Sequence, residues 1–287
     1  MPKKYEFTNE TKTFLGRSLY RIRALIAFGD VEAGELGGWI EKEENLAQEG
    51  NTWVYGNACV FGNARVYGNA EVCGDTWVYD NACVYGNARI YGNALVYGDA
   101  RVYDNACVYG NALVYGNALV YGDARIYGNA RIYGNALVYG NVFVYGNALV
   151  YGDAQVYGNA CVYGNALVYG NAFVYGDARV YGNACVYGNA LVCKSTHLLQ
   201  IGAIGSRNGF TTFARSKDKQ ILVACGCFRG TIDEFEAQVK KVHAGTKHEK
   251  TYLAAIKLAK LQIDDTEVKA DAAGQQPEAQ NGVWSGW

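Results

Sequence analysis

The sequence is poor in histidine, proline and methionine, and it has no long apolar run. Its 287 residues include three His, two Pro and one Met. The absence of a run of about 18 apolar residues argues against a transmembrane helix, and the basic start at Lys3 and Lys4 lacks the apolar core of a signal peptide. The formal charge of −1 argues against a protein that binds nucleic acid over its whole surface. We therefore expect a soluble, cytoplasmic protein.

The nine Cys do not form the spaced framework of a small disulfide-stapled protein. Most of them recur at one position of an internal repeat. This usage fits a reducing compartment, which agrees with the expected cytoplasmic location.

A six-residue repeat runs without a slip through the middle of the chain. An aliphatic residue stands at every sixth position from Val54 to Val192, which gives 24 positions in a unit that reads Ala-x-Val-Tyr-Gly-Asn. Period six does not fit the 3.6-residue spacing of a helix. It suits a short strand followed by a tight corner, because Ala and Val of one unit point to the same side and Gly-Asn accepts left-handed backbone.

Three such units close a triangular coil of 18 residues, because each unit supplies one strand and one corner. The 24 units then predict an all-β fold, a parallel β-helix of about eight coils. At a strand spacing of about 4.8 Å the rod is about 38 Å long.

In this pattern an aliphatic residue is followed four places later by a small one, as in Val60 and Ala64. It resembles the hexapeptide-repeat proteins with a left-handed parallel β-helix, and in particular the YdcK-like proteins of bacteria and their prophages, whose repeats run Val-Tyr-Gly-Asn-Ala. The opening segment Leu36-Gly37-Gly38-Trp39-Ile40-Glu41 looks similar too. The resemblance implies left-handed coils, a homotrimer and a phage or prophage origin. Tyr directly after the aliphatic residue departs from the enzyme-type repeat.

The variable position x points outward, and sorting it by the 18-residue coil gives three columns. The first column is mostly apolar and contains Cys59, Trp77, Leu95, Leu113, Arg131, Leu149, Leu167 and Cys185. Because an exposed apolar strip is typical of an interface, we predict a surface of self-association, with a trimer favoured, at Trp77, Leu95, Leu113, Leu149 and Leu167. The alternative is that Leu beside stacked Tyr shields the sheet.

Tyrosine is the most abundant aromatic residue, and 21 of the 24 Tyr directly follow the repeat aliphatic, from Tyr55 to Tyr187. They are expected to stack in ladders at the spacing of the coils. Such ladders either stiffen the corners or offer a platform for sugars or bases. We favour the structural role, because a platform rarely needs all three faces.

The rod lacks the residues that catalysis on this fold requires. The resemblance implies a His general base in acyltransferases and three His zinc ligands in carbonic anhydrases, and residues 54–192 contain neither a His nor a loop insertion. The repeat Cys have no activating base. The Asp residues at the corners do not share one column, which disfavours calcium. We predict no catalytic residue, no metal, no cofactor and no enzymatic activity.

The two ends differ from the repeat. Residues 1–53 are expected to form a β cap on one end of the helix that residues 54–193 build. Residues 194–263 predict a small basic α+β module, and residues 264–287, rich in Ala, Gln, Glu and Gly, predict a disordered tail.

Three strands and two helices are expected in the module. The strands are His197 to Ile204, Phe210 to Arg215 and Gln220 to Cys225. A capping box from Thr231 to Glu234 opens one helix, and a second runs from about His248 to Leu261. Cys225-Gly226-Cys227 is a weak metal signal, because zinc needs four ligands and His197 or His243 could complete the set only if the fold happened to bring them close.

The module is the place where a function other than architecture is expected. Residues 194–260 hold 12 Lys or Arg against five Asp or Glu. Arg207 lies in a Gly-flanked loop and Arg229 precedes Gly230 at a helix start, where backbone N–H groups suit anions. Arg207, Arg215 and Arg229 are therefore the candidate ligand-binding residues.

The leading hypothesis is a non-enzymatic structural or interaction protein, a rigid trimeric scaffold that presents the module to a protein partner. One alternative is a binding module for a nucleotide, a nucleic acid or another anion. Another is an enzyme that uses Cys227 or His243.

Overall fold

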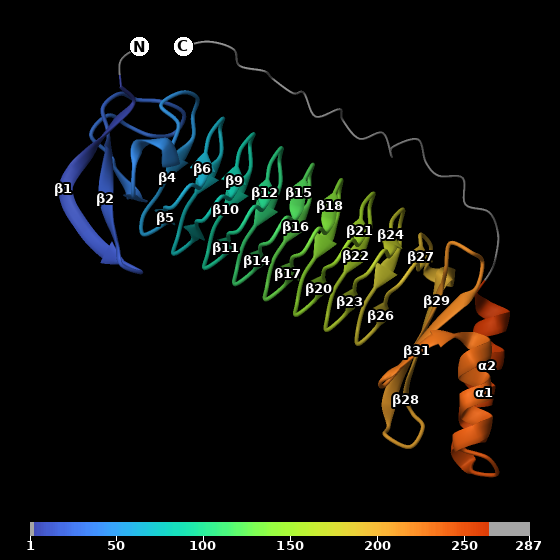
Figure 1. The fold of residues 1–287 in the computed structure, drawn as a ribbon. Coiled ribbons are helices and arrows are strands. Elements are labelled where there is room, and N and C mark those ends of the chain that lie inside the picture. Colours follow the sequence, from blue (N-terminus) through green and yellow to red (C-terminus); the bar gives the residue numbers. More distant parts are fainter. Residues whose placement is uncertain (1–2, 264–287) are drawn as a thin grey trace.

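The computed structural model describes residues 3–263 and shows a rod with a different structure at each end (Figure 1). The chain starts with an antiparallel hairpin, β1 (Tyr5–Phe14) and β2 (Arg17–Ala24), followed by β3 (Leu36–Ile40) and the short helix η1 (Glu43–Asn45). The rod follows as 24 strands, β4 to β27, of two or three residues each. Three parallel sheets run along it, which we name faces 1, 2 and 3.

Each face contains eight of these strands. Face 1 consists of β5 (Cys59–Val60), β8 (Trp77–Val78), β11 (Leu95–Val96), β14 (Leu113–Val114), β17 (Arg131–Ile132), β20 (Leu149–Val150), β23 (Leu167–Val168) and β26 (Cys185–Val186). Face 2 consists of β6 (Arg65–Val66), β9 (Cys83–Val84), β12 (Arg101–Val102), β15 (Leu119–Tyr121), β18 (Leu137–Tyr139), β21 (Gln155–Val156), β24 (Phe173–Val174) and β27 (Leu191–Val192). Face 3 consists of β4 (Trp53–Val54), β7 (Glu71–Val72), β10 (Arg89–Ile90), β13 (Cys107–Val108), β16 (Arg125–Ile126), β19 (Phe143–Val144), β22 (Cys161–Val162) and β25 (Arg179–Val180).

The pairing confirms a parallel β-solenoid with an 18-residue coil. Leu95 pairs with Trp77 on one side and with Leu113 on the other. The Leu95 N–H donates to the Ala112 carbonyl at 3.0 Å, so each coil satisfies the backbone of the next. The repeat Val, Ile and Ala side chains fill the interior and are almost entirely inaccessible to solvent.

The solenoid has about nine turns, one more than the repeat predicts. β3 pairs in parallel with β5, with Ile40 opposite Val60, and Leu46 bridges Val66. Both side chains are buried, so the stack begins before Val54. Sequence reasoning missed this coil because Val54 comes eight positions after Leu46, which breaks the period of six.

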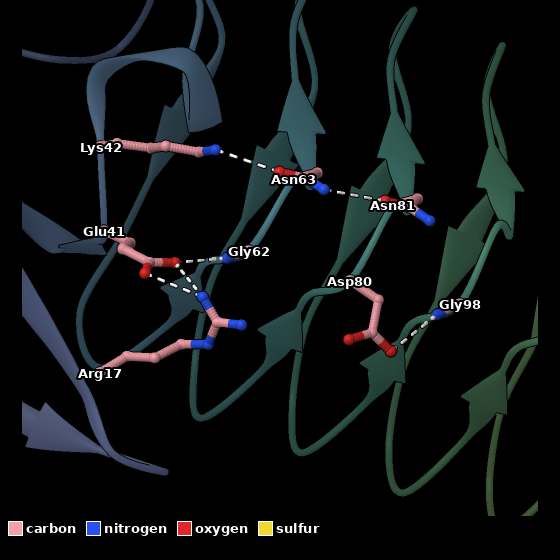
Figure 2. A pocket seen from close by; sticks show the side chains of 8 residues that line it. All are labelled: Arg17, Glu41, Lys42, Gly62, Asn63, Asp80, Asn81 and Gly98. Carbon is pink, nitrogen blue, oxygen red and sulfur yellow. Dashed lines mark hydrogen bonds and ion pairs between the residues drawn. The ribbon is translucent and has the colours of Figure 1, made fainter.

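The corners require left-handed backbone, and Gly supplies it. Gly116 has φ of +69°, and a Cβ there would lie 3.0 Å from the Gly134 nitrogen one coil on. In the same column Asp80 stands in the Gly position with φ of 59°. Its carboxylate accepts the Gly98 N–H at 3.4 Å, which offsets part of the strain (Figure 2).

The residue after each corner Gly forms a second ladder on the outside. The side-chain amide of Asn63 donates to Asn81 at 3.2 Å, and Asn81 donates to Asp99 at 3.0 Å. A carboxylate accepts but has no proton to donate, so an Asp ends a run of these bonds. The repeat Asp residues therefore fit the ladder as acceptors.

The C-terminal module is a four-stranded antiparallel sheet in the order β28-β29-β30-β31, with two helices. It follows the short helix η2 (Ser195–His197) and comprises β28 (Leu198–Ile204), β29 (Gly209–Arg215), β30 (Ile221–Cys225), β31 (Phe228–Thr231), α1 (Ile232–Val242) and α2 (Lys247–Gln262). The two predicted helices are confirmed, including the capping box at Thr231. The fourth strand was not expected.

The sheet of the module lies between the rod and the helices (Figure 1). Ala214 and Leu222 pack with the rod interior, whereas Phe213 and Val223 pack with the helices. Polar contacts join the same surfaces, since the Cys185 N–H donates to the Thr212 hydroxyl at 3.1 Å. The module thus closes the last coil.

Within residues 3–263, no helix is long and apolar enough to cross a membrane. The tail expected at residues 264–287 lies outside the described residues.

The corner geometry makes a prediction about stability. Gly116→Ala should lower the free energy of unfolding by about 1 kcal/mol or more, because it places a Cβ in left-handed backbone against the next coil. Gly116→Asp should cost less, because the carboxylate accepts the Gly134 N–H as Asp80 accepts that of Gly98. The midpoint of urea unfolding, followed by far-UV circular dichroism, measures both. Asp80→Gly, which restores the repeat residue, is the matched control, and a Gly116→Ala midpoint equal to wild type contradicts the prediction.

Candidate functional site

The predicted interface residues all lie on face 1. The N-terminal hairpin contacts one of them, Trp77, whereas the four Leu residues lie beyond it. Leu95, Leu113, Leu149 and Leu167 stand half-buried on strands β11, β14, β20 and β23, with Arg131 between them on β17. Trp77 instead packs against Phe14 of β1, with ring centroids 4.5 Å apart. The open row of Leu therefore begins beyond the N-terminal hairpin.

The three candidate arginines do not form one anion site. Arg229 points to the rod, where its Nε donates to the Tyr169 hydroxyl at 3.0 Å and its guanidinium lies over the Tyr187 ring. Arg215 is buried, with 4% of its surface exposed. Arg207 is exposed in the turn between β28 and β29. Each arginine thus belongs to a different surface, and sequence reasoning could not separate them because strand pairing decides their directions.

A cavity of about 380 Å³ opens beside Arg207. Its walls are apolar and include Ile204, Phe228, Phe235 and Val239, while Ser206, Arg207, Gln238 and His243 supply polar groups. Tyr252 closes one side, and burial raises the pKa of its hydroxyl to about 12. The cavity lies between two hairpin turns and the two helices, so it joins residues from 204 to 252.

The two cysteines of the Cys225-Gly226-Cys227 motif both line this cavity. Cys225 ends β30, and Gly226 and Cys227 form the turn into β31. Cys225 accepts from the Thr211 hydroxyl at 3.2 Å. Among residues 3–263 the structure contains no group of three or more His, Cys, Asp or Glu that could hold a metal ion.

A buried thiol–imidazole pair at the end of the rod escaped the sequence reasoning. The Cys193 sulfur lies 3.4 Å from Nδ1 of His197, and His197 has no exposed surface. The spacing of four residues was the available signal. Because no substrate reaches this pair, we assign it to the packing of the last coil.

The cysteines on the outside of the rod are poor nucleophiles. Burial raises the pKa of the thiols of Cys59, Cys73, Cys83, Cys107 and Cys161. The thiolate is the reactive form, so a raised pKa lowers reactivity at neutral pH.

The tyrosine ladders are present on all three faces. Tyr97 and Tyr115 are typical, with ring centroids 4.9 Å apart and planes 1° apart. Burial, followed by the neighbouring Tyr139 and Asp104, raises the pKa of Tyr121 to about 12. The rings cover one another face to face, which leaves their edges outward and supports a structural role.

A polar pocket lies where the N-terminal hairpin meets the first corners, lined by Arg17, Glu41, Lys42, Gly62, Asn63, Asp80, Asn81 and Gly98 (Figure 2). The Glu41 carboxylate accepts the Gly62 N–H at 2.6 Å and pairs with Arg17 at 2.9 Å. These contacts lower the pKa of Glu41, despite the opposing effect of burial. Glu41 accepts the Gly62 N–H as Asp80 accepts the Gly98 N–H two coils later, and the pocket is part of the docking of the cap.

Comparison with known proteins identifies the repeat and one relative that is similar over a short stretch. Successive matches to the YdcK β-solenoid repeat cover residues 88–186. The chain is similar to the "Uncharacterized acetyltransferase YdcK" of Escherichia coli (strain K12), at 41% identity over 61 residues. The match covers 18% of this chain and 19% of that protein, so it spans about a fifth of the relative's length.

The raised tyrosine pKa values predict how stability depends on pH. Tyr121 and Tyr157 both have a pKa of about 12 in the fold, whereas an unfolded chain releases this proton near 10. Their contribution is therefore complete below about pH 10 and is lost as the pH rises toward 12, because the unfolded state deprotonates first. We expect the thermal midpoint to fall in this range, and to fall less for Tyr121→Phe/Tyr157→Phe.

Thermal unfolding followed by circular dichroism between about pH 8 and pH 11 measures this difference. At pH 7 the variant should match wild type, because Phe61 already stacks on Tyr79 with planes 4° apart. If the thermal midpoint falls equally in both proteins at alkaline pH, ionisation of the ladder tyrosines does not cause the loss of stability.

Proposed function

We propose that the protein is a non-catalytic interaction scaffold, a rigid β-solenoid that self-associates through face 1 and holds its C-terminal module out to a partner. The observation that carries the proposal is the unbroken stack from β4 to β27, in which every coil has 18 residues and no loop interrupts the register. A stack of this kind fixes the spacing of its two ends, because backbone hydrogen bonds join each coil to the next along its length.

The ends fit the role of a spacer. The hairpin of β1 and β2 covers the first coil and the module covers the last one, so both ends of the rod interior are packed against other parts of the chain. The module has its own small core around Phe235 and Val239. It therefore forms a separate surface at the tip of the rod.

The relative's name includes acetyltransferase, and the residues of this chain argue against that activity here. The rod has no His, and burial raises the pKa of five of its thiols. The Cys–His pair at the end of the rod, Cys193 and His197, is buried. Acyl transfer needs a base that reaches both a nucleophile and the solvent-filled site.

Self-association is assigned to the row of Leu95, Leu113, Leu149 and Leu167, in which half-buried apolar side chains recur on one face. Arg131 within the row gives the interface a polar contact that fixes its register. A closed trimer around this row covers the apolar strip of every copy, which open chains of subunits do not.

The first test is the oligomeric state. Leu113→Glu/Leu149→Glu should convert the trimer into monomers, because it buries six carboxylates in the trimer without partners of opposite charge. Leu119→Glu/Leu137→Glu, with the same change on face 2, is the matched control and should remain a trimer. Sedimentation equilibrium measures both. A wild-type monomer, or the same change in both variants, would refute self-association through face 1.

The second test concerns catalysis. Purified full-length protein should neither bind acetyl-coenzyme A in isothermal titration calorimetry nor hydrolyse it above the uncatalysed rate, because no exposed base–nucleophile pair exists on the rod. His243→Ala/His248→Ala should leave this result unchanged. Saturable turnover that disappears in this variant would contradict the scaffold proposal and place an enzyme in the module.

A further inference from the structure

The module contains a cavity that takes no part in closing the rod. The closure of the rod uses the sheet surface with Ala214 and Leu222, whereas the cavity opens on the opposite surface, toward the helices. Figure 1 shows the turn after β28 and the turn after α1 together at the end of the module that projects away from the rod. The cavity between these turns is therefore free of the solenoid.

We propose that this cavity binds a small organic carboxylate with an apolar body, and that Arg207 holds its charged end. The inference deepens the proposed function, since it names what the presented module recognises. At about 380 Å³ the cavity is at the small end of ligand sites, enough for one aromatic ring or a short branched chain.

The walls define the apolar body of the ligand. Phe235 and Val239 are buried at the base of the cavity, and Phe228 packs against Phe235 with ring centroids 5.1 Å apart. Gly205 allows Tyr252 to close the side, because a Cβ at Gly205 would lie 1.7 Å from the Tyr252 hydroxyl oxygen. A ring or alkyl group in this space contacts aromatic and aliphatic carbon on several sides.

The charged residues around the cavity indicate the polar end of the ligand. Arg207 is the one Lys or Arg among the lining residues, and none of them is Asp or Glu. The two nearby helix-start carboxylates are engaged elsewhere: Glu234 accepts from the Thr231 N–H, and Glu249 accepts from the Gly245 N–H, both at 2.7 Å. Within residues 3–263, Arg207 has no ion-pair partner in its own chain. A guanidinium in this setting suits a planar carboxylate, which it binds with two parallel hydrogen bonds.

Gln238 and His243 complete the rim. The Gln238 amide offers both donors and an acceptor, and the His243 ring lies tilted beside the Tyr252 ring, with centroids 5.5 Å apart. These groups orient a ligand beside Arg207 but do not replace its charge. The inference differs from the three-arginine site predicted from the sequence, because Arg215 and Arg229 lie on other surfaces.

Phenylacetate and its uncharged counterpart phenylacetamide are suitable probes. Saturation-transfer NMR on the full-length protein should detect phenylacetate with a Kd of about 1 mM or tighter. Phenylacetamide should bind at least about tenfold more weakly, because it cannot use the charge of Arg207. Sulfate, which has no apolar body, should not displace phenylacetate at equal concentration.

Variants locate the site. Arg207→Gln and Gln238→Glu should each weaken phenylacetate binding at least about tenfold, the first by removing the cation and the second by adding a carboxylate at the rim. Both residues are exposed, so the fold should persist. Arg101→Gln, the same change of charge on face 2 of the rod, is the matched control and should bind as wild type.

Three results overturn the inference: no binding of phenylacetate, equal binding of phenylacetamide, or binding unaffected by Arg207→Gln. None of them bears on self-association, which the Leu113 and Leu149 variants test separately.

Discussion

The structure depends on the hydrogen bonds that join each coil to the next. Every strand of the rod has only two or three residues, too short to be stable alone. Stability arises because the same position in successive coils meets its equivalent, so that Leu95 lies between Trp77 and Leu113. One inserted residue would shift all later corners out of line. The constancy of the repeat is therefore a physical requirement of the stack.

This requirement explains the unusual composition. When equivalent residues stack about 4.8 Å apart, only side chains that interact well with copies of themselves are favoured at high frequency. Tyr does so through parallel rings, and Asn does so because one amide group both donates and accepts. Gly is needed where left-handed backbone passes close to the next coil, and Asp80 shows how an acidic side chain replaces it by binding the N–H of Gly98.

The sequence predicted the repeat and the two helices of the module, and it missed the contacts that occur only once. A period of six fixed the strands, the corners and the three outward columns. The additional coil at Ile40 and Leu46 was missed because its spacing to Val54 is irregular. The arginines of the module were grouped by their charge and by nearby glycines, but they lie on different surfaces. Arg229 binds the Tyr169 hydroxyl 60 residues earlier, a contact that no local pattern predicts. The cavity likewise depends on Tyr252 reaching the turn at Gly205.

The rod repeats its surface, whereas each end of the chain has a surface that occurs once. This difference decides where a specific ligand can be recognised. On the rod, a ligand that fits one coil finds nearly the same surface 18 residues later, so the rod offers many equal sites and little discrimination among positions. A unique site needs residues that occur once in a defined arrangement. In this chain those residues are at the two ends: the contacts of Glu41 and Arg17 are occupied in docking the cap, whereas Arg207, Gln238 and Tyr252 surround open space. The rod can set a distance and an orientation, and the module is the part that can select a ligand.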